Sequence, residues 1–96
     1  MFAIRLQRCR GETLLAACDI ELLDRELREG KMRLKVSPRF YHGEEADAET
    51  LRERLRSASI VNLVGERCIQ EAIAAGLECR ETLTIEGVPH AQIVRL

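Results

Sequence analysis

The sequence predicts one small α/β domain of the α+β kind, with a mixed sheet of about five to six strands and three helices. The chain has 96 residues, a length typical of one domain, and 46% of them are hydrophobic, too many for a disordered chain. Segments with apolar residues at every second position alternate with segments of helical spacing. No linker, repeat or low-complexity stretch divides residues 1–96, so we expect a single domain with the element order ββαβαβαββ.

The first two strands are predicted over residues 2–8 and 12–18, as a hairpin. A two-residue turn at 10–11 sets a register in which Leu6 faces Leu15, so that the apolar faces of both strands coincide. The other face of the second strand is also apolar. We therefore expect this strand to be central in the sheet and covered on both sides.

A helix is predicted next, over residues 19–29, with Asp19 as its N-cap and Gly30 as its left-handed end. Its spacing would bury Ile20, Leu23 and Leu27. Strict alternation then predicts a strand over residues 31–36, followed by a loop over 38–46. The remaining predicted elements are a helix over 47–58, a strand over 60–64, a helix over 66–75, and strands over 82–86 and 91–96 joined by a turn at 87–90.

The four cysteines give no metal or disulfide pattern. The hairpin register keeps Cys9 and Cys18 apart, and no basic-then-apolar signal segment starts the chain. The longest apolar runs are too short to cross a bilayer. We expect free thiols in a cytoplasmic protein, with no membrane association, no metal site and no cofactor.

Charge is unevenly distributed although the net charge is −1. Residues 31–42 carry a charge of +4 without any acid, the first ten residues +3, and the rest of the chain −8. The basic strand runs into Phe40 and Tyr41, and aromatic rings beside cations suit single-stranded or looped RNA. The predicted RNA-binding residues are Arg5, Arg8, Lys31, Arg33, Lys35, Arg39, Phe40 and Tyr41. Outward lysines that protect a sheet edge, with both rings packed under the loop, would explain the same pattern.

A second set of candidates surrounds the predicted strand at 60–64. Asn62 interrupts an otherwise apolar strand, and its amide needs a hydrogen-bond partner if buried. Gly65, Glu66 and Arg67 follow at the strand's end, while Gly87, Pro89 and His90 form a rigid turn. If Asn62, Glu66 and His90 converged, they would resemble an acid–base site; a purely structural role is the competing interpretation. The glycine-rich signature of nucleotide-binding loops is absent.

Several phrases of the sequence resemble an uncharacterised archaeal family, domain of unknown function 424. They are residues 18–23, 28–30, 40–43, 58–67 and 87–93, so the resemblance covers essentially the whole chain. It implies a small cytoplasmic archaeal protein without an assigned activity, and a link with translation or ribosome-associated genes. The resemblance assigns no role to any residue.

We therefore expect a non-enzymatic module that binds RNA or a ribonucleoprotein, with the ribosome or translation factors as partners. One alternative is a small enzyme or ligand-binding domain built around Asn62, Glu66, Arg67 and His90. Another is a protein-interaction or oligomer-forming subunit, which an exposed apolar sheet face would favour. The sequence leaves the oligomeric state open.

Overall fold

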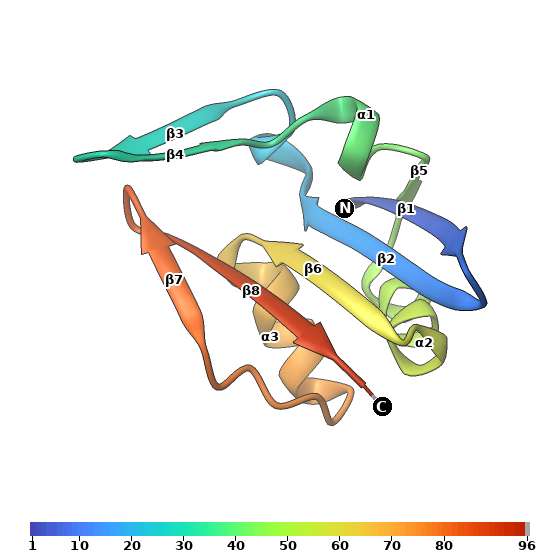
Figure 1. Ribbon diagram of the computed structural model, residues 1–96. Helices are drawn as coiled ribbons and strands as arrows, with labels where there is room; N and C mark the ends of the chain where they lie inside the picture. The colour runs from blue at the N-terminus through green and yellow to red at the C-terminus, as the bar shows by residue number, and fades with distance from the viewer. Residues whose placement is uncertain (96) are drawn as a thin grey trace.

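The computed structural model describes residues 1–95 and contains a six-stranded mixed sheet in the order β5-β1-β2-β6-β8-β7 (Figure 1). The strands are β1 (Phe2–Cys9), β2 (Glu12–Asp19), β5 (Glu44–Ala46), β6 (Ile60–Val64), β7 (Thr82–Ile85) and β8 (Val88–Val94). Among these strands only β2 and β6 pair in parallel; the other pairs described are antiparallel. The predicted α+β domain with a mixed sheet is confirmed.

The first hairpin has the predicted register, with Leu6 opposite Leu15. Arg10 and Gly11 both have positive φ, 52° and 82°, as the tight type I′ turn between two twisted strands requires. β2 is central, flanked by β1 and β6. Its buried residues Ala16 and Ala17 point to opposite faces, so both sides of this strand are covered.

Two helices cover one face of the sheet and lie behind it in Figure 1. They are α2 (Ala48–Ser57) and α3 (Glu66–Ala74), close to their predicted bounds. Asp47 caps α2 by accepting a hydrogen bond from the Thr50 amide at 2.8 Å. The main core lies between this helical layer and the sheet, and includes Ile4, Leu15, Leu51, Leu55, Val61, Leu63 and Ile69.

The predicted helix over 19–29 is wrong. The chain forms a short 3₁₀ turn (Ile20–Leu22), and Asp24 then adopts a left-handed φ of 72°. The hairpin of β3 (Glu26–Glu29) and β4 (Met32–Lys35) follows. Gly30, with φ of 62°, starts the two-residue turn of this hairpin instead of ending a helix.

The hairpin and α1 (Pro38–Tyr41) cover the upper part of the second sheet face. A smaller core fills the space between them, with Cys18, Leu27, Val36, Tyr41 and Val64 among its buried residues. The segment 38–46, predicted as a loop, contains two short elements instead, α1 and β5. In the last hairpin the turn is Glu86-Gly87, so Pro89 and His90 belong to β8 and not to a turn. Leu96, the end of the predicted last strand, lies outside the described residues.

No helix within residues 1–95 is long and apolar enough to span a membrane.

Candidate functional site

The lower part of the second sheet face has no layer above it, and we call it the open face. Register places three rows of side chains on the second sheet face. The upper row contains Ala3, Cys18, Val64, His90 and Leu83; the middle row Arg5, Ala16, Asn62 and Gln92; the lower row Gln7, Leu14, Ile60 and Val94. The upper-row residues on β1, β2 and β6 belong to the smaller core and are buried, so the open face consists of the middle and lower rows together with His90 and Leu83.

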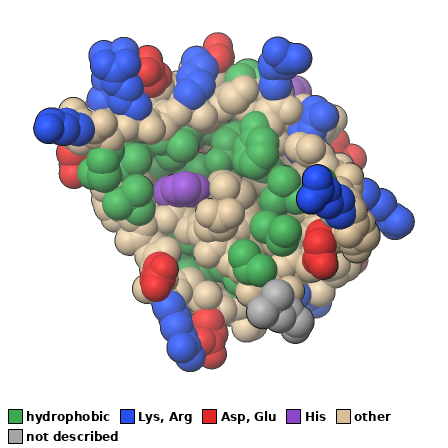
Figure 2. Space-filling view, viewed as in Figure 1, with side chains coloured by type: hydrophobic (Ala, Val, Ile, Leu, Met, Phe, Trp, Pro, Cys, Tyr) green, Lys and Arg blue, Asp and Glu red, His purple; other side chains and the backbone are tan. Residues whose placement is uncertain are grey.

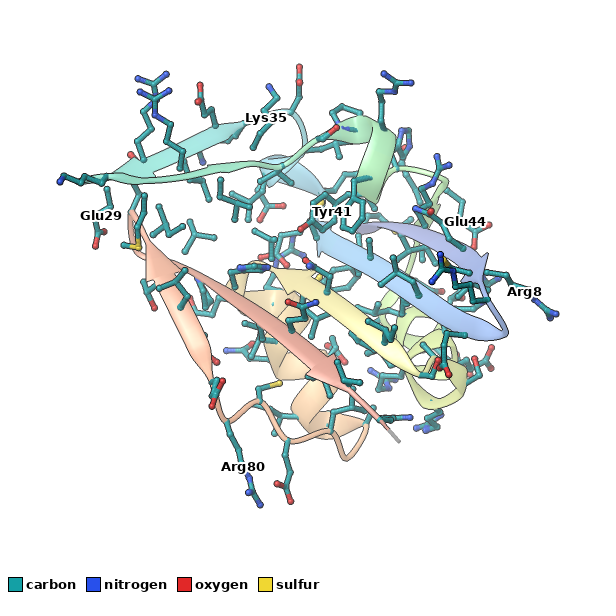
Figure 3. All side chains as sticks on the ribbon, viewed as in Figure 1. Arg8, Glu29, Lys35, Tyr41, Glu44 and Arg80 are labelled. Carbon is teal, nitrogen blue, oxygen red and sulfur yellow. The ribbon has the colours of Figure 1, made fainter. Side chains whose placement is uncertain are left out.

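Three polar side chains meet where the open face reaches α1. The Tyr41 hydroxyl donates a hydrogen bond to Asn62 Oδ1 at 2.6 Å, and His90 Nε2 lies 3.2 Å from the same oxygen. Figure 3 shows Tyr41 extending from α1 toward the sheet. Asn62 is thus satisfied by a residue 21 positions earlier in the chain, a partner that spacing in the sequence could not identify.

Burial and hydrogen bonding together determine the charge and the tautomer of the His90 imidazole. Partial burial lowers the pKa of His90, which favours the neutral ring at neutral pH. An amide oxygen can accept two hydrogen bonds, so Nε2–H donates to Asn62 Oδ1 beside the Tyr41 hydroxyl. Burial raises the pKa of Tyr41, so the phenol remains a proton donor. This cluster can orient a ligand through hydrogen bonds, but it contains no acid of its own.

An open depression of about 610 Å³ lies beside the cluster, over β7 and β8. Its lining includes Leu83, His90, Gln92 and Val94. Leu83 and Val94 are 48% and 58% exposed, and Figure 2 shows apolar side chains spread across this face of the molecule. The site is a broad surface instead of an enclosed pocket.

Glu66 and Arg67 do not join this cluster. Glu66 is exposed in the first turn of α3, on the helical side of the sheet. Arg67 forms an ion pair with Glu21 at 2.5 Å and lies near Asp19. The condition for an acid–base site, convergence of Asn62, Glu66 and His90, is therefore not met by Glu66, because β6 directs Asn62 away from the helices.

The free amides at the N-terminus of α3 are capped by a side chain of the protein itself. Buried Asp19 accepts hydrogen bonds from the amides of Arg67 and Cys68, at 3.2 and 2.8 Å. Gly65 has φ of 115°, and a Cβ there would lie 2.4 Å from the Asp19 carboxyl carbon. Asp19 thus caps α3 instead of the predicted helix after it, and its carboxylate takes the place of any external anion.

Gly87 and Pro89 contribute to the site through their backbone and not through their side chains. Gly87 has φ of 76° in the last turn, as a type I′ turn requires. The Pro89 carbonyl accepts a hydrogen bond from the Gly65 amide at 2.9 Å, which ties β8 to the end of β6. These contacts position His90 beside Asn62.

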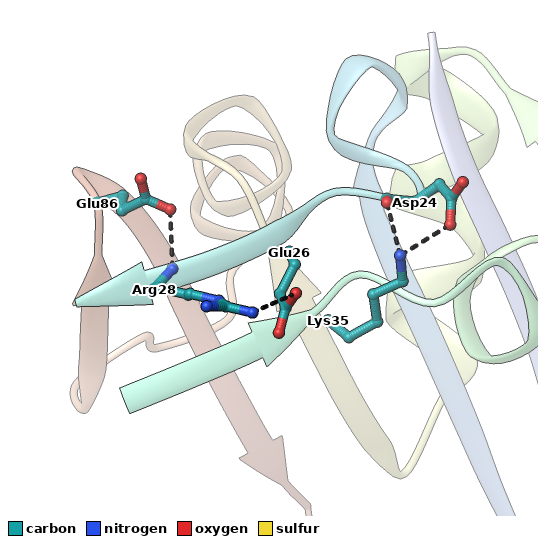
Figure 4. Close-up of polar contacts among 5 residues, drawn as sticks. All are labelled: Asp24, Glu26, Arg28, Lys35 and Glu86. Carbon is teal, nitrogen blue, oxygen red and sulfur yellow. Dashed lines mark hydrogen bonds and ion pairs between the residues drawn. The ribbon is translucent and has the colours of Figure 1, made fainter. Parts of the chain in front are cut away.

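One basic residue of 31–35 lies opposite an acid: Lys35 pairs with Glu26 across the hairpin, whereas Arg33 lies opposite Arg28. Lys35 binds the carbonyl and carboxylate of Asp24, at 2.8 and 3.0 Å, and Arg28 pairs with Glu26 at 3.1 Å (Figure 4). The neighbouring cations, Arg28 first, hold the pKa of Glu26 below its usual value. Hairpin pairing thus dilutes the segregation of charge that the sequence indicated.

The aromatic candidates are not both free to stack on a base. Tyr41 is buried, with 3% of its surface exposed, and meets Phe40 edge-on with ring centroids 4.9 Å apart. Phe40 is partly buried against the same small core. The prediction that Tyr41 stacks on RNA is wrong, because its ring fills the space between α1 and the sheet.

The four cysteines are free thiols, and Cys18 and Cys68 are buried. Burial raises the pKa of Cys18 to about 12 and that of Cys68 well above its usual value. Neither is a reactive thiolate at neutral pH. Within residues 1–95, no three acidic, histidine or cysteine side chains are grouped to hold a metal ion.

Comparison with known proteins places the chain in a family. Residues 7–96 match the family model described as protein of unknown function, DUF424. The chain belongs to this family. A crystal structure of an uncharacterized conserved protein from Methanopyrus kandleri is similar to this DUF424 member, at 26% identity and a TM-score of 0.79. The similarity covers 99% of this chain and 93% of that one. No curated protein matches the chain.

Proposed function

We propose that this DUF424 protein is a non-enzymatic module whose open face binds a protein partner. The observation that supports the proposal is the uncovered apolar surface around the depression, where Leu83 and Val94 are about half exposed. Neighbouring exposed apolar side chains rimmed by polar residues are typical of interaction sites. The side chains of Asn62, His90 and Gln92 lie within this surface, and their hydrogen bonds would fix the orientation of a bound partner.

The test compares two exposed aliphatic residues on opposite sides of the molecule. Val94 lies on the open face, whereas Ile73 lies on α3 and is 57% exposed. Tagged wild type, Val94→Glu and Ile73→Glu are used to capture partners from native lysate, with and without ribonuclease. We expect the same protein partner to bind wild type and Ile73→Glu under both conditions, and Val94→Glu to lose it. Equal loss in both variants, or loss after ribonuclease treatment, contradicts the proposal.

Binding to RNA or a ribonucleoprotein, with a link to translation in the cytoplasm, is the second candidate. Its support is that Lys31, Arg33 and Arg39 are exposed and form no ion pair with another residue of 1–95. Basic side chains line the upper edge in Figure 2. Phosphate contacts of this kind make binding fall steeply as salt rises.

Fluorescence anisotropy with unstructured RNA tests this candidate. We expect binding at low salt that weakens as salt rises and is lost when Lys31 and Arg33 are both changed to alanine. Arg80, exposed before β7 and paired with Glu78, supplies the control substitution to alanine. Absent binding at low salt, or equal binding by all variants, rejects RNA binding.

A further inference from the structure

The middle row of the open face contains a cation, Arg5, that has no ion-pair partner among residues 1–95. We propose that Arg5 binds a carboxylate of an extended, acidic and apolar segment of the partner, whose aliphatic side chains lie over Leu14, Ile60 and Val94. This inference rests on the proposed function and specifies the chemistry of the partner.

The Arg5 side chain is partly buried, and its Nε is shielded from solvent without a hydrogen-bond partner. No acid of residues 1–95 forms an ion pair with it. A buried donor without an acceptor is costly, so proteins rarely keep one. Because Arg5 as a whole is only partly buried while its Nε is shielded, a carboxylate of a partner would meet the accessible part of the side chain and not Nε.

The chain around Arg5 keeps this position open. Gly43 lies against it, and a Cβ added to Gly43 would sit 3.4 Å from Arg5 Cγ. Glu45 is the acid of β5 on the same face, but its register partner is Ala3. The nearby carboxylate of Glu44 is bound to Arg54 at 2.7 Å. Neither neighbouring acid neutralises the guanidinium.

Charge complementarity sets the chemistry of the partner. With His90 neutral, Arg5 is the only cation in the three rows defined above. Two acids lie at the ends of the face: Glu45, opposite Ala3 on β5, and Glu81, in the lining of the depression. A matching surface carries one acid and otherwise uncharged, apolar groups. The guanidinium presents several donors in a plane, which suits a carboxylate.

A protein segment fits this surface better than RNA does. Single-stranded RNA needs several cations along its backbone and aromatic rings on which its bases stack. The open face offers one arginine, aliphatic side chains at Leu14, Ile60 and Val94, and a tyrosine that is already buried. Aliphatic side chains favour burial against aliphatic side chains.

Strand spacing gives the length of the segment. Adjacent strands lie about 4.8 Å apart, so crossing from β1 to β8 spans roughly 14 Å. An extended chain rises about 3.3 Å per residue and turns every second side chain to the same side. The segment is therefore about five residues long, with an acid at its first position and aliphatic residues at its third and fifth. The side-chain amides of Asn62 and Gln92 lie along this path and can form hydrogen bonds with the backbone of the segment.

Selection from a phage-displayed library of random seven-residue peptides tests the inference. On wild type we expect enrichment of an acid followed by aliphatic residues two and four positions later. Arg5→Gln should keep the aliphatic preference and lose the acid. Arg8, on the same strand but the other face, provides the matched control Arg8→Gln, which should select the wild-type pattern.

One selected peptide is then measured by fluorescence anisotropy. We expect Arg5→Gln to weaken its binding roughly tenfold to a hundredfold, as loss of a charged hydrogen bond does. A peptide with its acid changed to the amide should lose the same factor on wild type, which excludes misfolding of the variant as the cause.

The outcomes separate the two proposals. Aliphatic enrichment without an acid overturns the role of Arg5 and leaves the open face as a protein-binding surface. No enrichment on wild type relative to Val94→Glu overturns both. Binding of a ten-nucleotide uridine RNA that is lost in Arg5→Gln, with no peptide enriched, assigns Arg5 to RNA and also overturns the inference.

Discussion

Asp19 joins three segments of the chain through one buried carboxylate. It ends β2, accepts hydrogen bonds from the first amides of α3, and lies opposite the one glycine that permits its approach. The guanidinium of Arg67 stands over the Phe2 ring, 5.2 Å from its centroid, and links the carboxylates of Asp19 and Glu21. A side chain that satisfies several buried donors is difficult to replace.

Removing the charge of Asp19 should therefore destabilise the protein. For Asp19→Asn we expect the free energy of unfolding to fall by about 1–3 kcal/mol, because an amide group is a weaker cap and presents donors to donors. Glu21→Gln, which alters the exposed partner of the same arginine, should cost less than about 1 kcal/mol. Urea denaturation measures both. A loss for Glu21→Gln as large as that for Asp19→Asn would assign the effect to Arg67 and not to the cap.

His90 should make stability depend on pH in a defined direction. Its folded pKa lies below its unfolded value, so the unfolded chain binds more protons between the two. The contribution of His90 is present above pH ~6.5 and is lost as the pH falls toward its folded pKa. We expect the free energy of unfolding to decrease from pH 7.5 to 5.5, and His90→Gln to flatten that decrease. His42→Gln, at an exposed position, is the control; an unchanged pH slope in His90→Gln contradicts the assignment.

At the scale of elements, local signals predicted the strands better than they predicted the β3–β4 hairpin. The Arg10-Gly11 turn and the alternation around it define one register for the first hairpin. Residues 20–27 have helical spacing, yet Leu27 pairs with Leu34 and packs under the hairpin. A glycine with positive φ occurs both at helix ends and in two-residue turns, so Gly30 suited either structure.

The candidate site was predictable only where local rules signal a need for a partner. Asn62 in an apolar strand indicated a hydrogen bond, but Tyr41 and His90 reach it through tertiary packing. The importance of Arg5 had no sequence signal beyond its charge, because its isolation depends on which acids lie near it. Gln92 enters the site through its register opposite Asn62.

The hairpin should be attached mainly by its buried leucine. Leu27 is fully buried. Two exposed hydrogen bonds hold the tip: the Arg28 amide donates to the Glu86 carboxylate at 2.8 Å, and the Glu86 amide donates to the Glu29 carboxylate at 2.9 Å. We expect Leu27→Ala to cost about 2–4 kcal/mol, and Met32→Ala, at a more exposed position of the same hairpin, about 1 kcal/mol or less. Amide hydrogen exchange should show faster exchange in β3 and β4 for Leu27→Ala. Unchanged protection there would mean that the polar contacts hold the hairpin.

For the whole molecule, the same substitution should be severely destabilising on one sheet face and nearly neutral on the other. Val61 on β6 points into the helical core and is fully buried, whereas Val94 on β8 points to the open face and is 58% exposed. Val61→Glu buries a carboxylate without a partner, so we expect no folded protein at neutral pH. Val94→Glu should change the free energy of unfolding by less than about 1 kcal/mol, because a solvated strand face accepts a charge. Thermal and urea unfolding, measured at two protein concentrations, check both. A large loss for Val94→Glu together with a melting temperature that rises with concentration would mean that a second copy covers the open face, since only self-association links stability to concentration.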